Sequence, residues 1–596
     1  MPANTKSEED ALLEGLPVID TSDIGLELDD EDLQQLGMDF NIQKSPQTVS
    51  KPEAIKAFKA AEKAAKKMDW GNVAKHLLIA WDAVPNDLGL LTLLAHSLVQ
   101  LGVREKAIAV LERALKYHEP TPDICAIMLE LAVKMEFYDI AIKVGHQLIA
   151  MDADTPSHFV NLASAYSGAE RYDEGIELLQ AVLPRFPKHG DLWNVLATMV
   201  RFRDGIGPSY VFLDEALRVD PTNYKALSNY AQSLTFDLRL EEALKMDARA
   251  MRANPSNPEP FLGAAQLQFY FGKLDKAWDN YTRRLDHTRR LNQTQIFTHK
   301  VPKWKGQDLA GKSLFILGEQ GIGDEVMFGT YMTFLYEQVE KLYIGCDYRL
   351  VSIYQRRFPN ATVEAYRDAF AHNYRYRSFP KIESDMAKGE ISIDYAIEVA
   401  SCPRFEWTKT ANIKPHPAGY LVPDPELDEK FKDKLAAAGS KPKIGIAWRS
   451  GNLTGLRSGI YASIEELGPL FALKDEVDFV NLQYGECADE LVRAKELFGV
   501  DIIQFDDVDL KKDIEANLAI MNNCDFVVAA VSAPAIFSQA IGTRTVLLTQ
   551  IAPWWCFGDR EKIPFAPGTT FIDAQGGVSW AEVAEFAADT IRRNLG

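Results

Sequence analysis

A repeat of 34 residues constrains this chain more than any other feature of its sequence. Seven repeats begin at residues 54, 88, 122, 156, 190, 224 and 258. Small or apolar residues at the eighth and twentieth positions allow the two helices of one hairpin to approach closely. Proline at the thirty-second position ends the second helix, because proline cannot continue a helix. The residues at these three positions are Ala61, Ala95, Leu129, Ala163, Ala197, Ala231 and Ala265; Val73, Ala107, Ala141, Gly175, Ser209, Ala243 and Ala277; and Pro85, Pro187, Pro221 and Pro255.

This spacing predicts seven helical hairpins over residues 54–290. The pattern resembles the tetratricopeptide repeat (TPR), whose repeats stack into a superhelix with a concave binding groove. The third repeat departs most from the pattern. It has Leu129, Gly145 and Ala153 where Ala, a large apolar residue and Pro are usual.

Two rows of side chains on the first helices are the candidate acceptor-binding residues of this groove. Asn161 and Asn229 share the sixth position, and an amide can bind a peptide backbone of any sequence because it both donates and accepts. Phe202, Phe236 and Tyr270 share the thirteenth position. The groove of the O-linked N-acetylglucosamine transferase family is similar. The alternative, that the rings pack between repeats and the asparagines are solvated, stays open.

Composition and charge limit the partners and the compartment. The net charge of −20 over 596 residues argues against nucleic acid and against an anionic membrane surface as partners. No run of eighteen apolar residues occurs, so we expect no membrane insertion. The start lacks a secretory signal, and the six cysteines are scattered without a CxxC pair. We therefore expect a cytoplasmic protein with free thiols, no metal and no cofactor.

After residue 300 the 34-residue repeat ends and the spacing of apolar residues changes. Short apolar runs alternate with amphipathic stretches, which predicts parallel sheets covered by helices on both faces. We expect a disordered acidic tail over 1–50, two Rossmann-like halves over 300–415 and 441–596, and a Pro-rich linker over 416–440. Ligands of such sheets bind beyond the carboxyl ends of the strands. The candidate strands are 313–317, 341–346, 362–365, 391–397, 443–448, 477–483, 501–505, 525–531 and 545–548.

The string from Gly318 to Glu325, Gly-Glu-Gln-Gly-Ile-Gly-Asp-Glu, is the sharpest local signal for a site. It follows an apolar strand and opens a helix. Gly321 and Gly323 permit a tight turn and close approach of a ligand to the backbone. The N–H groups at a helix start favour an anionic or polar ligand. Asp324 then stands either in the cleft as a functional carboxylate or as a plain helix cap.

Residues 300–596 resemble the heptosyltransferase-like glycosyltransferases, in the branch that follows TPR repeats, because Glu319–Asp324 is close to its signature. The resemblance implies the GT-B fold, with an acceptor half before the linker and a nucleotide-sugar donor half after it. It implies that Asp324 is the general base, which takes the proton of the acceptor hydroxyl. The reaction would invert and need no metal. The helix N–H groups beside Asp324 predict a low pKa for its carboxyl.

Three further strings resemble the donor half of this family. Ile444–Asn452 is similar to its first strand and loop, Asn481–Gln483 to the strand end near the nucleotide base, and Val531–Ala535 to the phosphate-binding turn. The guanidinium fork of Arg449 would pair with a donor phosphate, and an ordinary ion pair is the alternative. The donor-binding residues implied are Gly321, Gly323, Arg449, Asn452, Gln483, Ser532 and Ala533.

The sequence departs from this family at the phosphate-binding turn. Val531 stands where Asp is usual, and Ile536 stands near the place of a His. The loss of both polar groups leaves the donor type and the activity itself open. Two other features are similar to the family. They are the Trp554–Arg560 block, like its Trp-rich loop near the donor, and a final helix over 580–594 that we expect to return to the first half.

The overall plan resembles the FlmG-type flagellin glycosyltransferases. That resemblance implies a protein O-glycosyltransferase that modifies Ser or Thr of flagellin with a nonulosonic acid of the pseudaminic type. The TPR array would hold the protein acceptor. A CMP-linked donor has one phosphate, so it would tolerate the altered turn. Two alternatives remain: a non-catalytic TPR adaptor on a decayed transferase fold, and a glycan or lipopolysaccharide glycosyltransferase.

Overall fold

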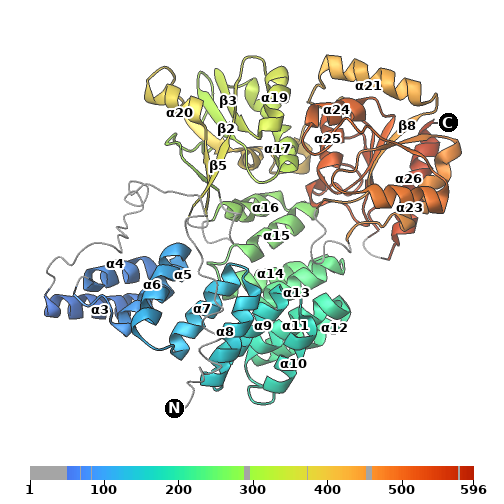
Figure 1. Cartoon of the computed structure of the whole chain (residues 1–596). Coiled ribbons are helices and arrows are strands. Elements are labelled where there is room, and N and C mark those ends of the chain that lie inside the picture. The colour runs from blue at the N-terminus through green and yellow to red at the C-terminus, as the bar shows by residue number, and fades with distance from the viewer. Residues whose placement is uncertain are drawn as a thin grey trace, which may run out of the picture. The chain divides into compact units, whose positions relative to one another are not determined.

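The computed structural model describes residues 50–67, 69–81, 83–101, 103–286, 295–371, 374–451, 460–574 and 577–595 (Figure 1). The expected acidic tail, 1–50, lies outside these residues except for Ser50. The chain divides into two compact modules. The first module is Met1–Ala226 with Phe370–Asn373, and the second is Leu227–Ala369 with Tyr374–Gly596.

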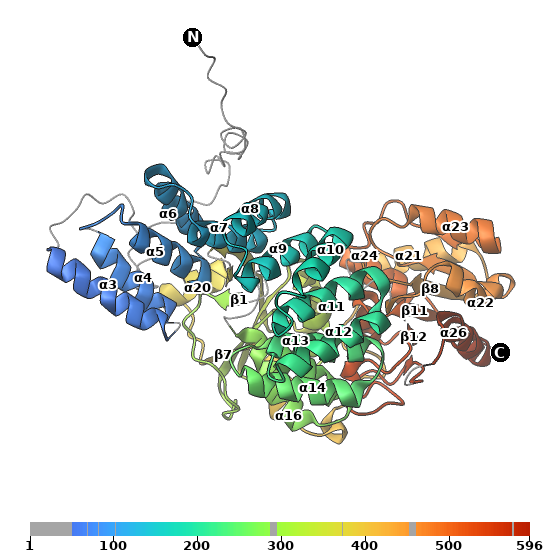
Figure 2. The ribbon, with the colours of Figure 1, turned by 90° about the horizontal axis from the view of Figure 1, so that it is seen from below.

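Helical hairpins build the described part of the first module, and consecutive helices pack side by side (Figure 2). From the second repeat to the fifth, every first helix begins at the residue that the 34-residue period predicts. The TPR-like hairpins are thereby confirmed. The helices are α3 (Lys51–Ala65), α4 (Trp70–Trp81), α5 (Leu88–Leu101), α6 (Arg104–Tyr117), α7 (Pro122–Lys134), α8 (Tyr138–Met151), α9 (Pro156–Gly168), α10 (Tyr172–Val182), α11 (Gly190–Asp204) and α12 (Ile206–Val219).

Small residues lie at the centres of these hairpins, as the repeat predicts. Ala61, Ala95 and Ala163 are fully buried in the two apolar clusters of the first module. The irregular third repeat has a physical reason. A Cβ added at Gly145 would lie 2.8 Å from Cδ1 of Leu162, so glycine there makes room for a leucine of the next repeat.

The second module begins within helix α13 (Tyr224–Phe236) and contains the last repeat helices as well as both parallel sheets. These helices are α14 (Leu240–Ala253), α15 (Glu259–Tyr270) and α16 (Leu274–Tyr281), followed by the 3-10 turn η2 (Thr282–Leu285). Nε1 of Trp278 donates to the carbonyl of Trp407 at 2.7 Å, and Phe269 packs against Phe557. The seventh repeat is therefore built into the α/β module, although its sequence continues the array.

The first parallel sheet has the strand order β4-β3-β2-β7. Its strands are β2 (Ser313–Leu317), β3 (Lys341–Cys346), β4 (Thr362–Ala365) and β7 (Tyr395–Glu398), with helices α17 (Ile322–Gly329), α18 (Met332–Tyr336), α19 (Val351–Arg357) and α20 (Pro380–Ala387). A small sheet, β1-β6-β5, was not expected. Its strands mix Arg, Tyr and Phe and lack an apolar run. They are β1 (Gln295–Phe297), β5 (Arg367–Ala371) and β6 (Tyr374–Ser378).

The second parallel sheet has the order β10-β9-β8-β11-β12-β13, which is the 3-2-1-4-5-6 order of dinucleotide-binding folds. Its strands are β8 (Lys443–Ala447), β9 (Asp478–Asn481), β10 (Ile502–Ile503), β11 (Phe526–Ala530), β12 (Thr545–Leu548) and β13 (Thr569–Thr570). Its helices are α21 (Pro425–Ala438), α22 (Gly468–Phe471), α23 (Ala488–Phe498), α24 (Ile514–Asn522), α25 (Ala533–Ile541) and α26 (Trp580–Leu595). The region after residue 300 therefore has the expected parallel α/β character.

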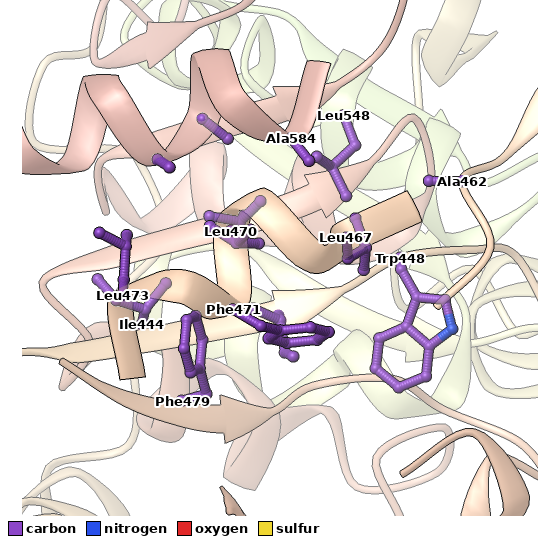
Figure 3. Packing of buried hydrophobic residues seen from close by; sticks show 14 of the residues in the cluster. Ile444, Trp448, Ala462, Leu467, Leu470, Phe471, Leu473, Phe479, Leu548 and Ala584 are labelled. Carbon is purple, nitrogen blue, oxygen red and sulfur yellow. The ribbon is translucent and has the colours of Figure 1, made fainter. Parts of the chain in front are cut away.

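Two expectations for the second half are wrong. The final helix α26 does not return to the first half, because its apolar face packs with Leu470 and Leu548 in the core of its own sheet (Figure 3). The expected linker over 416–440 contains helix α21. The ring of its Phe431 packs 5.2 Å from that of Phe505, so this helix belongs with the second sheet.

The chain segment that does join the two halves precedes α21. The N–H groups of Tyr420 and Leu421 both donate to the carbonyl of Ala540 in α25, and the Tyr420 hydroxyl donates to Val326 O in α17 at 2.6 Å. Gly419 has a φ of 70°, and a Cβ there would lie 2.3 Å from the carbonyl carbon of Ile541. Only glycine permits this approach of two backbones.

We expect Gly419→Ala to destabilise the protein by about 3 kcal/mol, because it adds a backbone clash to the cost of a left-handed alanine. Gly389→Ala is the matched control, since Gly389 has a φ of 74° and nothing within 4 Å of an added Cβ. It should cost about 1 kcal/mol. Urea unfolding of both variants measures the difference. Equal losses of stability would show that the joint at Gly419 is not tightly packed.

Candidate functional site

The N-termini of two helices meet in the second module. One helix follows the first strand of the first parallel sheet, and the other follows the fourth strand of the second. Helix α17 follows β2, and helix α25 follows β11. The two helices lie side by side (Figure 1). A Cβ added at Gly323 would lie 3.4 Å from both Cα and Cβ of Ala533. The structure therefore brings together the glycine-rich turn and the expected phosphate-binding turn, which lie far apart in the sequence.

Asp324 lies at this meeting point, in the first turn of α17. Its Oδ2 accepts a hydrogen bond from the backbone N–H of Gly321 at 3.3 Å, and its side chain is half-buried. The capping role is thus confirmed, and a function for this carboxylate stays a prediction. Gly321 itself is exposed, and Gly323 is covered by α25.

The pKa of Asp324 is raised to about 6, chiefly because burial disfavours the charged carboxylate. The Gly321 N–H opposes this shift, the negative charge of Glu319 adds to it and the positive charge of Arg284 opposes it. The expectation of a low pKa is therefore wrong. Desolvation outweighs the helix N–H groups, and the result is a carboxylate suited to accept a proton near neutral pH.

Gly318 and Glu325, at the two ends of the glycine-rich string, are buried and shape the turn from inside the fold. A Cβ at Gly318 would lie 2.7 Å from the carboxyl carbon of Glu325, so glycine lets that carboxylate fold under the strand end. Glu325 accepts from the N–H of Asp347 and the hydroxyl of Tyr366, each at 3.0 Å. Burial raises the pKa of Glu325 to about 8. Arg377 donates to the carbonyl of Gly318 at 2.7 Å.

Glu319 and Gln320 are held by residues that follow the last repeat. Arg284 donates through Nε and Nη2 to the two carboxylate oxygens of Glu319, at 2.9 and 2.5 Å. Gln320 has a φ of 55°, and its side-chain amide is hydrogen-bonded to the hydroxyl of Tyr281. The sequence did not predict the roles of Tyr281, Arg284 and Arg377 at this turn. Nothing in their local pattern connects them to residues far away along the chain.

Helix α25, which packs against α17, begins at the switch point of the second sheet. Strands β8 and β11 are neighbours there, with β9 and β12 on their outer sides, and the rule for open sheets puts a ligand at such a point. Ser532 is the residue before α25, and its hydroxyl donates to Ala530 O at 3.1 Å. Val531 is half-buried and Ile536 is buried. The two apolar replacements are therefore packed into the fold.

Arg449 forms the ion pair that was the alternative to a phosphate contact. Its Nε donates to both oxygens of Glu490, at 2.8 and 3.0 Å, and its Nη2 donates to the carbonyl of Glu486. A phosphate role would require this pair to open. Gln483 is buried, and its Oε1 accepts from the backbone N–H of Arg449, so it supports the loop. Asn452 lies outside the described residues.

A pocket of about 430 Å³ lies beyond the carboxyl ends of β9 and β10. Its wall includes Gln483 and Cys487 from the loop after β9. The acidic side chains Asp506 and Asp509 and the cation Lys511 come from the loop after β10. The predicted base-binding segment is therefore beside a cavity, on the same edge of the sheet as the start of α25.

The candidate acceptor residues have different surroundings. Asn161 and Asn229 are half-buried on their first helices, and so is Phe236. The ring of Phe202 stacks on Tyr172 of the preceding repeat at 5.8 Å, which is the alternative interpretation of the aromatic row. Tyr270 is only 4% exposed.

Tyr270 is therefore not a groove residue, and its assignment to acceptor binding is wrong. Its hydroxyl donates to Asp573 at 3.1 Å, and Arg560 lies over its ring. The Trp554–Arg560 block that carries this arginine packs on the seventh repeat, because Gly558 and Gly272 meet backbone to backbone. The block forms a junction, in which Trp554 packs on Tyr281 and on Phe328 of α17, and its expected place near the donor stays a prediction.

Two negative observations hold for the described residues. They contain no cluster of three His, Cys, Asp or Glu side chains that could hold a metal ion. None of the described helices combines the length and the apolar character needed to cross a bilayer. All six cysteines are free and buried, which matches the expected thiols.

We expect Asp324→Asn to raise the melting temperature at pH 8 and to leave it nearly unchanged at pH 4. The folded pKa of about 6 lies above the ordinary value of 3.8, so wild-type stability is reduced as the pH rises through 6. The amide cannot ionise and escapes that penalty. Asp433→Asn on the exposed face of α21 is the control, which should change stability equally at both pH values. Equal effects of Asp324→Asn at pH 4 and pH 8 would contradict the raised pKa.

No family model matches the sequence. A relative, Protein FlbA of Caulobacter vibrioides, is 31% identical over 472 residues, which are 78% of this chain and 77% of FlbA. The match therefore extends beyond what the repeats alone could account for.

Solved structures match over the repeats. A thermophilic TPR protein of Thermus thermophilus is 20% identical with a TM-score of 0.29, and the match covers 30% of this chain and 98% of that chain. YrrB, described as a TPR protein with an unusual peptide-binding site, is 16% identical with a TM-score of 0.26, covering 30% of this chain and 92% of that chain. The hairpins of this chain establish the repeats independently. By its identity to Protein FlbA over most of both lengths, the chain belongs to the FlbA family.

Proposed function

We propose that this protein is a protein O-glycosyltransferase of the GT-B type, with Asp324 as general base and the helical repeats as the grip for a protein acceptor. One observation carries the proposal. The glycine-rich turn and the start of α25 meet around a half-buried carboxylate with a pKa of about 6. A proton-accepting group beside the N–H groups of two helix starts suits transfer from an anionic donor.

The reaction follows from this arrangement. The acceptor Ser or Thr oxygen attacks the anomeric carbon of the donor sugar, and the bond from that carbon to the nucleotide phosphate breaks. Asp324 takes the hydroxyl proton as the new bond forms. The electron pair of the broken bond stays on the phosphate, whose charge the N–H groups at Ser532 and Ala533 would stabilise. Attack opposite to the leaving phosphate inverts the anomeric configuration and needs no covalent enzyme intermediate.

The donor that fits best is a CMP-linked nonulosonic acid. Arg449 is held by Glu490, and Val531 and Ile536 supply no polar group. The described donor side therefore offers a helix start and no free guanidinium, which suits one phosphate better than two. We propose flagellin as the acceptor, since the repeats followed by the transferase resemble the FlmG-type plan, and a cytoplasmic site of action.

A non-catalytic adaptor is the second candidate, and one observation favours it. The buried Ile536 and the paired Arg449 leave the expected phosphate site without its usual side chains. The same repeats would then bind a protein that the chain does not modify. The raised pKa of Asp324 favours the enzyme, because an adaptor has no use for a proton acceptor at a helix start.

We expect Asp324→Asn to abolish modification of flagellin co-expressed with a complete nonulosonic acid pathway. Removal of a general base lowers the rate about 100- to 10,000-fold. The intact mass of the flagellin measures the outcome. The control variant Asp433→Asn should modify flagellin to the same extent as the wild-type protein. Unmodified flagellin with the wild-type protein would favour the adaptor.

The rate should also depend on pH. Below pH 6 the Asp324 carboxyl is protonated and cannot accept the acceptor proton, so kcat/KM should fall tenfold per pH unit on the acid side of about 6. Initial rates of transfer between pH 4.5 and 8 measure this limb. A flat profile across that range would rule out Asp324 as the base.

The asparagine row predicts an effect on acceptor binding alone. The double variant Asn161→Ala, Asn229→Ala should raise the KM for the protein acceptor about tenfold, from about 0.5–1.5 kcal/mol per lost hydrogen bond. The kcat of the double variant should stay at the wild-type value, and so should its rate of donor hydrolysis in the absence of acceptor. Neither asparagine belongs to the turn that carries Asp324. An unchanged KM would remove these residues from the grip.

A further inference from the structure

The last repeat contributes a buried charge to the turn that carries Asp324. Arg284 follows α16, and its side chain is 3% exposed, while that of Glu319 is 2% exposed. Besides the two bonds between them, Arg284 donates to Oγ of Ser401 at 2.7 Å and to the carbonyl of Tyr281 at 3.2 Å. Glu319 accepts a further bond from the N–H of Ala400 at 3.1 Å. The pair therefore ties three separate chain segments together.

The backbone of the turn depends on the same segment. Gln320 lies in the left-handed region, which costs a residue with a side chain about 1–2 kcal/mol. The hydroxyl of Tyr281, which lies shortly before Arg284, hydrogen-bonds the Gln320 amide at 3.2 Å. In the same turn, the Asp324 carboxylate accepts from the N–H of Gly321, the residue after Gln320. A shift of Gln320 would displace this N–H and with it the carboxylate.

We propose that Arg284 and Tyr281 are positioning residues for Asp324, so that the end of the helical array forms part of the catalytic machinery. This inference rests on the proposed transfer reaction. Arg284 and Glu319 fix the side of the turn that faces the repeats, and Arg377 fixes its other end through Gly318 O. Loosening of the seventh repeat then moves the base, so proton transfer depends on the packing of that repeat.

The charges of the pair provide a readout that a purely structural role would not move. Glu319→Gln removes the anion, and Arg284, which cannot lose its charge, then lacks this counter-charge beside Asp324. A cation whose charge is no longer offset by Glu319 stabilises the Asp324 carboxylate. The acid limb of kcat/KM should therefore move to lower pH by about one pH unit. The wild-type limb near pH 6 is the reference.

Glu515→Gln is the matched control. Glu515 also accepts two bonds from one arginine, Arg356, at 2.7 and 3.1 Å, in the same module. This pair joins α19 to α24 and touches no residue of the turn. Its loss should reduce stability without moving the acid limb. Identical limbs for Glu319→Gln, Glu515→Gln and wild type would overturn the inference.

Arg284→Lys keeps the charge and removes the fork. An ammonium group cannot serve both oxygens of Glu319 together with Ser401 and Tyr281 O. We expect the acid limb to stay near pH 6 and kcat to fall about 10- to 100-fold, as for a misplaced base. A wild-type kcat would count against positioning by Arg284. This variant also covers the case in which Glu319→Gln does not fold.

Hydrogen exchange separates this inference from the proposed function. In the full-length protein, Glu319→Gln and Arg284→Lys should each speed amide exchange in a peptide spanning residues 318–329 at least tenfold, and Glu515→Gln should leave it at the wild-type rate. Faster exchange without any modification of flagellin would refute the transferase and keep the positioning. Unchanged exchange would refute the positioning whatever the transfer assay shows.

Discussion

The buried ion pair between Arg284 and Glu319 is the interaction on which the site depends. Two charges removed from water cost more than their attraction returns unless further hydrogen bonds complete them. Here Ser401, Ala400 and the carbonyl of Tyr281 complete them. Such a pair contributes little net stability. Its value lies in geometry, because it leaves one position for the turn between β2 and α17. The raised pKa of Asp324 is a consequence of the same enclosure, since burial is its largest cause.

Close backbone approaches hold the rest of the second module around that turn. Gly419 meets Gly542 where the joining segment passes the end of α25, and Gly272 meets Gly558 where the seventh repeat meets the Trp-rich block. Tyr420 then links α25 to α17 through its backbone and its hydroxyl. The glycines of this module therefore serve mainly to bring segments together. Gly321 and Gly323 belong to the turn that carries Asp324, and Gly323 packs against Ala533.

Much of the fold could be predicted because its signals are periodic and local. The 34-residue period placed the first helices from the second to the sixth repeat at their starting residue. The apolar runs at 313–317, 341–346, 362–365 and 545–548 are strands with those bounds. The strands of the small sheet were not predicted, because β5 and β6 have no apolar pattern and are stabilised by the pairing of Arg377 with Asp368. The packing partner of α26 was predicted wrongly, because the sequence of an amphipathic helix does not show which sheet its apolar face packs against.

The sequence by itself determined the helical repeats, the parallel strands and the glycine-rich turn with its acidic residue, because each of these depends on neighbours within a few residues. The tertiary structure decided what those elements do. It buried Tyr270 against Asp573, paired Arg449 with Glu490 and raised the pKa of Asp324. Each of these outcomes depends on partners or on a solvent boundary supplied by distant parts of the chain, and side-chain chemistry alone cannot specify them.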